Sequence, residues 1–407
     1  MMIECKAQAA GERRVYVDYN ATTPLRQEVK AAMLEDMEIF GNASSMHASG
    51  RLAHARVEGA RSAVEKLLGM NSGSQPELAA RSGVIFFTSG GSESNNTVFH
   101  TMRQLAQKDR RCEFITTAIE HPCVLNAAKY TQELGFKVIF LPVDECGKVR
   151  IDELTKALSE KTLLVSIMTA NNEIGTVQDI KEISALVKAA GAWMHTDAVQ
   201  ALGKIPVNVD DLGVDYLTLS AHKIYGPKGI GALYVRTGSP ILPLIHGGKQ
   251  ENGLRAGTSN NGGILGFGRA AALALDDLEK YGREMAALRD RLRDGLAAAI
   301  PRMKINGHPA DVLPNTLNVS FSGAEGEAIL LSMDIMGIEA STGSACASGS
   351  LEPSHVLIAT GVGPELAHGS IRFSLGWGVS ADDIDYIVKT LPPIIARLRA
   401  MSSSFFK

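Results

Sequence analysis

The stretch Ser-Ala-His-Lys-Ile-Tyr-Gly-Pro-Lys-Gly occupies residues 220–229 and stands between two apolar runs. Val214–Leu219 before it and Ile230–Val235 after it are rich in aliphatic, aromatic and β-branched residues, which is typical of buried strands. Lys223 is therefore predicted at the exit of a core strand. A single lysine in such a loop is usually a solvated cation, but a desolvated lysine has a lowered pKa and its neutral amine can form a Schiff base. We take Lys223 as the candidate anchor of an aldehyde cofactor.

The composition is that of an ordinary globular protein with room for two domains. The chain has 407 residues, of which 45% are hydrophobic and 21% are charged. A net charge of −3, without a basic run, gives no reason to expect nucleic acid or an anionic membrane as a partner. No apolar run has the length of a transmembrane helix, and Met1–Lys6 lacks the apolar segment of a signal peptide. The five cysteines are odd in number and scattered, which predicts a reducing, cytoplasmic setting.

Strand-like and helix-like segments alternate between residues 84 and 235. Helix-like segments such as Cys123–Leu134 and Asp179–Ala190 lie between most of the strand candidates. The strand candidates are Val84–Thr88, Glu113–Thr117, Lys137–Leu141, Thr162–Thr169, Ala192–Thr196, Val214–Leu219 and Ile230–Val235. This alternation predicts an α/β fold whose mainly parallel, seven-stranded sheet is covered by helices on both faces. The short turn before the last strand allows that strand to be antiparallel.

The pattern changes after residue 262. A long helix is predicted over Ala271–Ala299, and a final helix runs from Asp382 to Met401. Between them lie strand-like Asn315–Phe321, helical Glu325–Met336 and strand-like Ser370–Leu375. We predict a large domain over residues 26–262 and a smaller α+β domain formed by residues 1–25 and 263–407.

Two more polar segments follow predicted strands, at the edge where open α/β sheets place their ligands. Residues 88–94, Thr-Ser-Gly-Gly-Ser-Glu-Ser, precede a helix whose first N–H groups favour an anion such as phosphate. Taken alone, an ordinary strand-to-helix turn explains this segment equally well. Asp197, within His-Thr-Asp-Ala-Val-Gln at 195–200, suits a protonated ring nitrogen, a helix cap or a metal. A phosphate turn, an acid and a lysine together meet the needs of pyridoxal phosphate.

At these residues the chain resembles the cysteine desulfurases of the NifS/IscS type, which are fold-type I pyridoxal-phosphate enzymes of the class V aminotransferase family. The similarity runs through nearly the whole chain, from Asp18–Pro24 to Arg372–Gly376. Any one matching segment is a weak signal, but their number and order make a strong one. The most specific are Thr-Ser-Gly-Gly-Ser-Glu-Ser-Asn at 88–95, Glu-His-Pro at 120–122, Asn-Asn-Glu-Ile-Gly at 171–175, the segments at 195–200 and 220–229, Arg-Ala-Gly-Thr at 255–258 and Ser-Ala-Cys at 344–346.

The resemblance implies a role for each matching position around the cofactor ring. Lys223 would hold the cofactor as an imine and then act as the base at the substrate Cα. His121 would stack on the ring and assist proton transfer. Asp197 would pair with the ring nitrogen, and Gln200 would bond the ring hydroxyl. Asn172 would help to orient both the ring and the substrate.

The resemblance also implies how the phosphate and the substrate are held. Arg372 would bind the substrate carboxylate with two hydrogen bonds. Thr258 would reach the phosphate of the neighbouring subunit's cofactor, which predicts a homodimer. The family commonly has an arginine where this chain has Asn252, and this puts local ion pairing near the dimer contact in doubt. The phosphate ligands within the chain would be Gly91, Ser92, Ser220 and His222.

Cys346 lies in Ser-Thr-Gly-Ser-Ala-Cys-Ala-Ser-Gly-Ser at 341–350, a run of small residues without apolar periodicity. An isolated cysteine is usually a small buried hydrophobe, but this run offers little core to join, and a loop thiolate can act as a nucleophile. The resemblance implies that Cys346 takes the sulfur of L-cysteine as a persulfide and that L-alanine is released. The sulfur would pass to an iron–sulfur scaffold or another acceptor protein. No resident metal is implied, although Cys346 could ligate iron during transfer.

Rival functions account for less of the sequence. A selenocysteine lyase or an aminotransferase would share the fold, but the long small-residue run around Cys346 favours the desulfurases. A dinucleotide-binding protein is suggested by Gly266-Phe-Gly268, which has no strand before it. A non-catalytic sulfur carrier would need Cys346 but would have no use for Lys223, Asp197 and Gln200 together.

Overall fold

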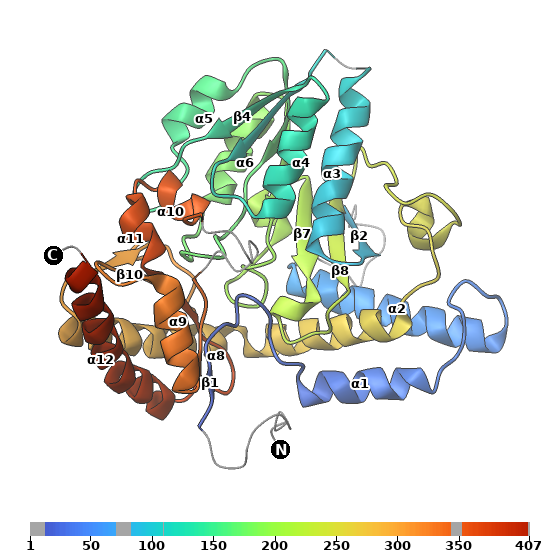
Figure 1. Ribbon diagram of the computed structural model, residues 1–407. Helices are drawn as coiled ribbons and strands as arrows, with labels where there is room; N and C mark the ends of the chain where they lie inside the picture. The colour runs from blue at the N-terminus through green and yellow to red at the C-terminus, as the bar shows by residue number, and fades with distance from the viewer. Residues whose placement is uncertain (1–12, 71–82, 109, 343–351, 406–407) are drawn as a thin grey trace.

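The computed structural model describes residues 13–70, 83–108, 110–342 and 352–405 (Figure 1). Its largest sheet has seven strands in the order β2-β8-β7-β6-β5-β3-β4. The strands from β3 to β7 pair in parallel, and β8 runs antiparallel to both β7 and β2. The mainly parallel sheet and the antiparallel last strand are thus confirmed. The bounds are β2 (Gly83–Thr88), β3 (Glu113–Thr117), β4 (Lys137–Leu141), β5 (Thr162–Ser166), β6 (Trp193–Asp197), β7 (Tyr216–Ser220) and β8 (Gly231–Arg236).

The strands of this sheet bury both of their faces, because helices cover each side. In β2, Phe86 packs into one apolar cluster, whereas Ile85 and Phe87 pack into another. This alternation follows the two-residue period of a strand. Figure 1 shows α3 and α4 in front of the sheet and α6 behind it. The helices that flank the sheet are α3 (Gly91–Ala106), α4 (Pro122–Glu133), α5 (Ile151–Ala157), α6 (Ile180–Ala189) and α7 (Val209–Leu212), with α1 (Gln27–Met37) and α2 (Ala48–Leu67) below it.

The C-terminal part contains a smaller antiparallel sheet with the order β12-β10-β9. The N-terminal segment joins this part, because β1 (Val15–Tyr16) pairs in parallel with β11 (Ile338–Glu339). Val17 and Tyr19 belong to the same apolar cluster as Phe373. The remaining elements are β9 (Met303–Asn306), β10 (Thr316–Phe321), α9 (Gly326–Ile335), α10 (His355–Ala359), α11 (Pro364–His368), β12 (Ser370–Ser374) and α12 (Ala381–Phe405). None of the helices in the described ranges is long and apolar enough to cross a membrane.

Helix α8 (Asn261–Ala299) runs beneath both parts of the molecule (Figure 1). Its first turns, including Phe267, pack into the core of the large sheet, and Leu292 packs into the core of the small one. The helix begins at Asn261, where Asn260 Oδ1 accepts a hydrogen bond from Gly263 N at 3.1 Å, and not at Ala271 as predicted. The domain limits stay a prediction.

The early glycines of α8 explain this difference. Glycine disfavours a helix in isolation, yet here it permits close packing. A Cβ at Gly268 would lie 2.5 Å from both Cα and Cβ of Ala60 in α2, and one at Gly266 would lie 2.9 Å from Met33 in α1. The glycines that weaken the helical sequence pattern are therefore the residues that close packing against α1 and α2 requires.

Gly268→Ala should destabilise the protein, because the added methyl group meets the backbone of α2. We expect the free energy of unfolding to fall by about 1–3 kcal/mol, as for an overpacked core. Gly282→Ala is the matched control in the same helix, because a Cβ at Gly282 meets no atom within 4 Å; it should raise stability by roughly 0.5–1 kcal/mol. Denaturant unfolding measures both. Equal effects of the two variants would contradict the close approach of α8 and α2.

Candidate active site

A cavity of about 380 Å³ lies at the carboxyl ends of β5, β6 and β7. It brings together nearly all of the side chains singled out in the sequence, although they come from both sheets. The candidates that line it are Gly91, Ser92, His121, Asn172, Asp197, Gln200, Ser220, His222, Lys223 and Arg372. Asn20, Ala21 and Cys123 also line it, and no role had been assigned to them.

Lys223 reaches the cavity from a short turn, Ala221–Lys223, at the end of β7. Its Nζ donates hydrogen bonds to the main-chain oxygens of Asn20 at 2.6 Å and Ala21 at 2.7 Å. The N-terminal segment also holds the turn itself, because Tyr225 N donates to Thr23 Oγ1 at 2.7 Å. Tyr225 has a φ of 65°, which is unfavourable for a bulky residue. The turn is therefore held by its contacts with the N-terminal segment.

Asp197 ends β6 with its carboxylate facing the cavity. Its Oδ2 accepts a hydrogen bond from Asn95 Nδ2 at 2.7 Å, and its Oδ1 accepts one from Val199 N at 3.0 Å. The residue is only 6% exposed, and no ion pair joins it to a cation within the described ranges. A buried carboxylate that is bonded only by neutral donors suits a cationic partner brought in by a ligand.

His195 fixes β6 between its two neighbours. Its Nδ1 lies 2.8 Å from Ser166 Oγ in β5, and its Nε2 lies 3.1 Å from Thr218 Oγ1 in β7. Burial lowers the pKa of His195 to about 3, so the ring is neutral and links the two hydroxyl groups. Because His195 and Asp197 are two residues apart on one strand, they share a face of the sheet. The histidine supports the strand that presents the acid.

The residues at one end of the cavity have features that favour binding of an anion. Gly91 and Ser92 begin α3, whose first N–H groups have no partner within the helix. Gly90 precedes them with φ 155° and ψ −178°, a conformation that is essentially limited to glycine. Ser220 and His222 come from the β7 exit. Burial, followed by the charges of nearby lysines, lowers the pKa of His222 to about 4.

His121 is the N-cap of α4, immediately before Pro122. Its Nδ1 accepts a hydrogen bond from Cys123 N at 3.2 Å and lies 2.9 Å from Cys123 Sγ. The proton of the neutral ring therefore sits on Nε2. Burial lowers the pKa of His121, which favours this neutral form. Burial also raises the pKa of Cys123 to about 12, so this cysteine is a thiol in the cavity wall.

Arg372 comes from β12 in the smaller sheet and is 2% exposed. Its Nη1 donates to Asn172 O at 3.0 Å, and its Nη2 pairs with Asp18 Oδ1 at 2.7 Å. Its Nε has no hydrogen-bond partner among the described residues. A buried guanidinium that lines the cavity and keeps N–H groups unused among the described residues fits a carboxylate ligand.

Cys346 lies outside the described residues, but residues described on either side of it bond to a predicted site residue or to neighbours of site residues in the sequence. Ser341 N and O pair with the backbone of Arg372, at 3.3 and 2.6 Å. On the other side, Ser354 Oγ donates to the buried carboxylate of Glu173, and His355 Nε2 lies 3.0 Å from Glu120 O. One flank is thus hydrogen-bonded to the site residue Arg372, and the other is bonded to residues that adjoin Asn172 and His121 in the sequence.

Thr258 is exposed and does not line the cavity of its own chain. Nearby, Arg255 Nε pairs with Glu93 Oε1 at 3.1 Å. Asn252 has a φ of 56°, a left-handed conformation that asparagine tolerates better than most residues. Glu251 pairs with Arg61 at 2.8 Å. Within the chain, this loop is thus held by the ion pairs Arg255–Glu93 and Arg61–Glu251.

Glu120, next to His121, should make stability depend on pH. Burial raises the pKa of its carboxyl group to about 8, against ~4.3 in an unfolded chain. Between these values the folded protein binds one more proton than the unfolded chain, so its stability falls as pH rises through this interval and levels off above it. Glu120→Gln keeps an oxygen for Thr117 Oγ1 and Met168 N and should remove this decline.

Denaturant unfolding between about pH 5 and 9 measures the effect. The variant should be more stable than the parent protein at the alkaline end. Glu133→Gln, which changes an exposed glutamate in α4, is the control and should keep the parent's pH dependence. An unchanged profile in Glu120→Gln would show that Glu120 is ionised in the folded protein.

Comparison with known proteins gives one consistent answer. The family model described as "Aminotransferase class-V" matches residues 15–387. The chain is 49% identical over 392 residues to "Cysteine desulfurase IscS" of Dictyoglomus turgidum, covering 96% of this chain and 97% of that protein. It is 47% identical to the protein of the same name from Methanosarcina thermophila, covering 96% and 94%. A solved structure titled "NifS-like protein" has a TM-score of 0.86 at 41% identity and covers 95% of this chain and 100% of its own.

Enzymes of this family use pyridoxal phosphate, and the residues of the cavity fit it. An amine, a buried carboxylate without a cationic partner among the described residues and a helix N-terminus with glycines line one space. A Cβ at Gly91 would lie 3.1 Å from Val199, so a side chain there would crowd the wall of the cavity. The chain therefore belongs to the class V aminotransferase family of fold-type I pyridoxal-phosphate enzymes, as a cysteine desulfurase of the NifS/IscS type.

Proposed function

We propose that this enzyme takes sulfur from free L-cysteine and leaves it as a persulfide on Cys346, with Lys223 as the base at the substrate Cα. One observation carries the proposal: Lys223 from the β7 exit, Asp197 from β6 and Arg372 from β12 line one cavity. When bound there, pyridoxal phosphate supplies the electron sink on which removal of the Cα proton depends. Asp197 is the residue placed to pair with its ring nitrogen, and Gln200 the residue to contact its hydroxyl group.

Arg372 is proposed to hold the substrate carboxylate. Its Nε–H is unused among the described residues, and the contacts with Asp18 and Asn172 leave a further N–H on each terminal nitrogen. These two contacts also fix the plane of the guanidinium, so a carboxylate meets a donor pair that is already oriented. Substrate binding therefore costs little side-chain ordering.

Lys223 is proposed to take the Cα proton at Nζ. The main-chain oxygens of Asn20 and Ala21 lie 2.6 and 2.7 Å from that atom and would stabilise the ammonium that results. His121 carries its proton on Nε2, because the Cys123 N–H bonds its Nδ1. The imidazole is therefore placed to donate a proton during the later steps.

The sulfur step balances without a further reactant. The Cys346 thiolate attacks the substrate sulfur, a sulfur–sulfur bond forms, and the substrate Cβ–S bond breaks. The Cβ atom then takes a proton, and L-alanine leaves. We propose that the persulfide sulfur goes on to an iron–sulfur scaffold or another acceptor protein. Free thiols at Cys112, Cys123 and Cys146 support the predicted reducing, cytoplasmic setting.

Cys346→Ser tests the sulfur acceptor. With L-cysteine and a reductant, we expect this variant to lose sulfide release by more than about a hundredfold, because the nucleophile is gone. It should keep the colour of bound pyridoxal phosphate, because Cys346 holds no part of it. The control, Cys146→Ser, removes a thiol that does not line the cavity and should keep full activity. Alanine formation by Cys346→Ser at the parent rate, or persulfide found on another cysteine, would refute this assignment.

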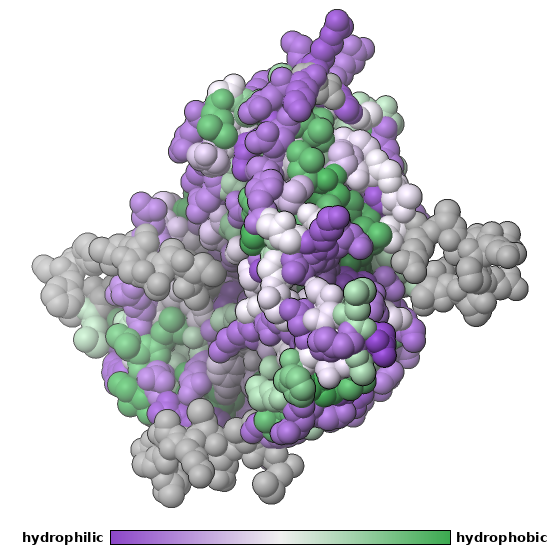
Figure 2. Space-filling view, turned by 90° about the vertical axis from the view of Figure 1, so that its right-hand side faces the viewer, coloured by the Kyte–Doolittle hydropathy of each residue, from purple (hydrophilic) through white to green (hydrophobic). Residues whose placement is uncertain are grey.

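We also propose that the enzyme is a homodimer in which Thr258 contacts the cofactor phosphate of the other subunit. Two observations support this. Thr258 does not line the cavity of its own chain, and large apolar side chains between α1 and α2 are exposed: Met37 by 70%, Phe40 by 89% and Met46 by 89%. Figure 2 views the side where α1 ends and α2 begins and shows apolar residues gathered between polar ones. Such exposure is typical of an interface.

Mixing two impaired variants at limiting cofactor tests the shared site. Lys223→Ala lacks the base, and Thr258→Ala should bind pyridoxal phosphate about tenfold or more weakly, as expected for loss of a hydrogen bond to a charged group. In a mixed dimer, the subunit with Lys223 receives an intact Thr258 from its partner. Cofactor-limited activity should therefore return after the two variants are mixed and re-formed as dimers. If Thr258 served its own chain, mixing would restore nothing.

A further inference from the structure

Lys204 is a buried lysine that the mechanism above does not use. It lies after β6 and is 3% exposed. Its Nζ donates to Gln200 Oε1 at 2.7 Å and to Asn20 Oδ1 at 2.9 Å. Both acceptors are neutral, and within the described ranges no carboxylate pairs with Lys204. Burying an amine without a counter-ion is costly, so a structural role alone gives a weak reason for a lysine here.

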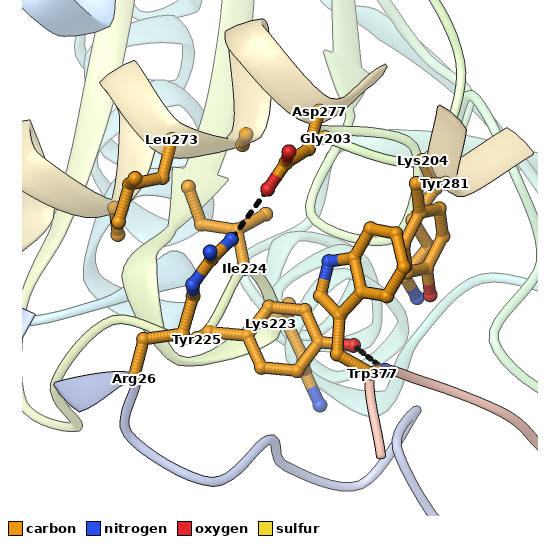
Figure 3. Close-up of a pocket in the computed structure, with 12 residues that line it drawn as sticks. Arg26, Gly203, Lys204, Lys223, Ile224, Tyr225, Leu273, Asp277, Tyr281 and Trp377 are labelled. Atoms are coloured by element: carbon orange, nitrogen blue, oxygen red, sulfur yellow. Dashed lines mark hydrogen bonds and ion pairs between the residues drawn. The ribbon is translucent and has the colours of Figure 1, made fainter. Parts of the chain in front are cut away.

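The position of Lys204 separates it from the cofactor. It does not line the 380 Å³ cavity, whereas Gln200 and Asn20 do. It lines a second cavity of about 10 Å³ beside Lys223, next to the Arg26–Asp277 ion pair (Figure 3). A space of that size holds about one water molecule and no larger ligand. Lys204 therefore reaches Gln200 from behind the active site, without touching substrate or cofactor.

The contact with Gln200 has a direction. A carboxamide has an accepting oxygen and a donating NH₂ group, and a lysine amine acts as the donor towards the oxygen. With Oε1 held by Lys204, the NH₂ group must face the other way, where it donates to Asn20 O at 3.0 Å. Its second N–H remains for a ligand in the cavity that Gln200 lines. Without Lys204, the amide could turn its oxygen towards the cavity.

The contact with Asn20 keeps the lysine in place. Asn20 Nδ2 donates to Asn172 O at 3.2 Å and Thr316 Oγ1 at 2.9 Å, so its Oδ1 is fixed on the side of Lys204. Burial lowers the pKa of Lys204 well below its usual value. A neutral amine still has two N–H groups, which match the two acceptors. The arrangement therefore holds whether or not the amine is charged.

We propose that Lys204 is a positioning residue, which holds Gln200 Oε1 from behind the cavity and so keeps the Gln200 NH₂ group turned towards the bound cofactor. This rests on the proposed function of Gln200 as a cofactor contact. This role would explain why a lysine is buried at a position that the proposed reaction steps do not use.

A double-mutant cycle tests the proposal. Lys204→Met, Gln200→Ala and the double variant are prepared, and the dissociation constant of pyridoxal phosphate and its absorption maximum when bound are measured. Lys204→Met alone should weaken binding about five- to tenfold, the effect of one hydrogen bond, and should shift the absorption maximum. In the Gln200→Ala background it should change neither by a measurable amount, because its effect passes through Gln200. The same fold-change in both backgrounds would overturn the proposal.

Two further variants separate positioning from stability. Lys148→Met is the matched control, because Lys148 also has two acceptors, Asp179 and Asp311, each at 3.0 Å, but does not line the cavity. It should lower the unfolding temperature of the cofactor-free protein and leave the dissociation constant unchanged. If Lys204→Met does not fold, Lys204→Ala takes its place, since it also removes the donor to Gln200 Oε1. An unchanged dissociation constant and spectrum in Lys204→Ala, with Gln200→Ala affected, would refute the role of Lys204 alone.

The Gln200→Ala variant also separates this inference from the function on which it rests. If it binds pyridoxal phosphate as tightly as the parent protein, Gln200 is not a cofactor contact and both statements are wrong. If it binds more weakly while Lys204→Met does not, only the role of Lys204 is wrong.

Discussion

The contact between the N-terminal segment and the lysine turn is the constraint on which the site depends. The carbonyl oxygens of Asn20 and Ala21 receive Lys223 Nζ, and Asp18, on the same segment, pairs with Arg372 of the smaller sheet. One short N-terminal segment therefore fixes Lys223, the proposed base, relative to Arg372, the residue proposed to hold the substrate. Neither sheet could fix that relation alone, because Lys223 follows β7 and Arg372 lies in β12.

The acid and the amine of the site do not pair with each other. Within the described residues, Asp197 accepts hydrogen bonds only from neutral donors, and Lys223 donates to two carbonyl oxygens. The nearby histidines are kept neutral, because burial lowers the pKa values of His195 and His121. If the acid and the amine formed an ion pair with each other, they would have fewer interactions left for a ligand. Among the described residues, no cation pairs with Asp197, which suits a cofactor that has a cationic nitrogen.

Local pattern predicted the sheet well, because its strands bury both faces and are rich in apolar and β-branched residues. All seven strands lie within three residues of the predicted bounds, as with β3 at Glu113–Thr117. The start of α8 could not be predicted in this way. Gly266 and Gly268 weaken the helical signal, and the reason for them is the close approach of Met33 and Ala60 from helices far away in the sequence. Where tertiary packing determines which residue is needed, helix propensity along the sequence gives the wrong prediction.

The candidate site shows the same division. Lys223, Asp197 and Arg372 were found because matching segments mark them, and the structure places them around one cavity. Asn20 and Lys204 were not assigned roles, since an asparagine in a loop and a lysine after a strand have no local pattern that marks them as buried. Their place follows only from the burial of Lys204 and from the hydrogen bonds that converge on Asn20.

The cysteines near the site also differ in what the sequence and the structure say of them. Cys123 lies in the cavity wall, yet burial raises its pKa to about 12, which makes it a poor nucleophile. Ser341 and Ser354, on either side of Cys346 in the sequence, bond to Arg372 and Glu173, and Cys346 remains the proposed sulfur acceptor.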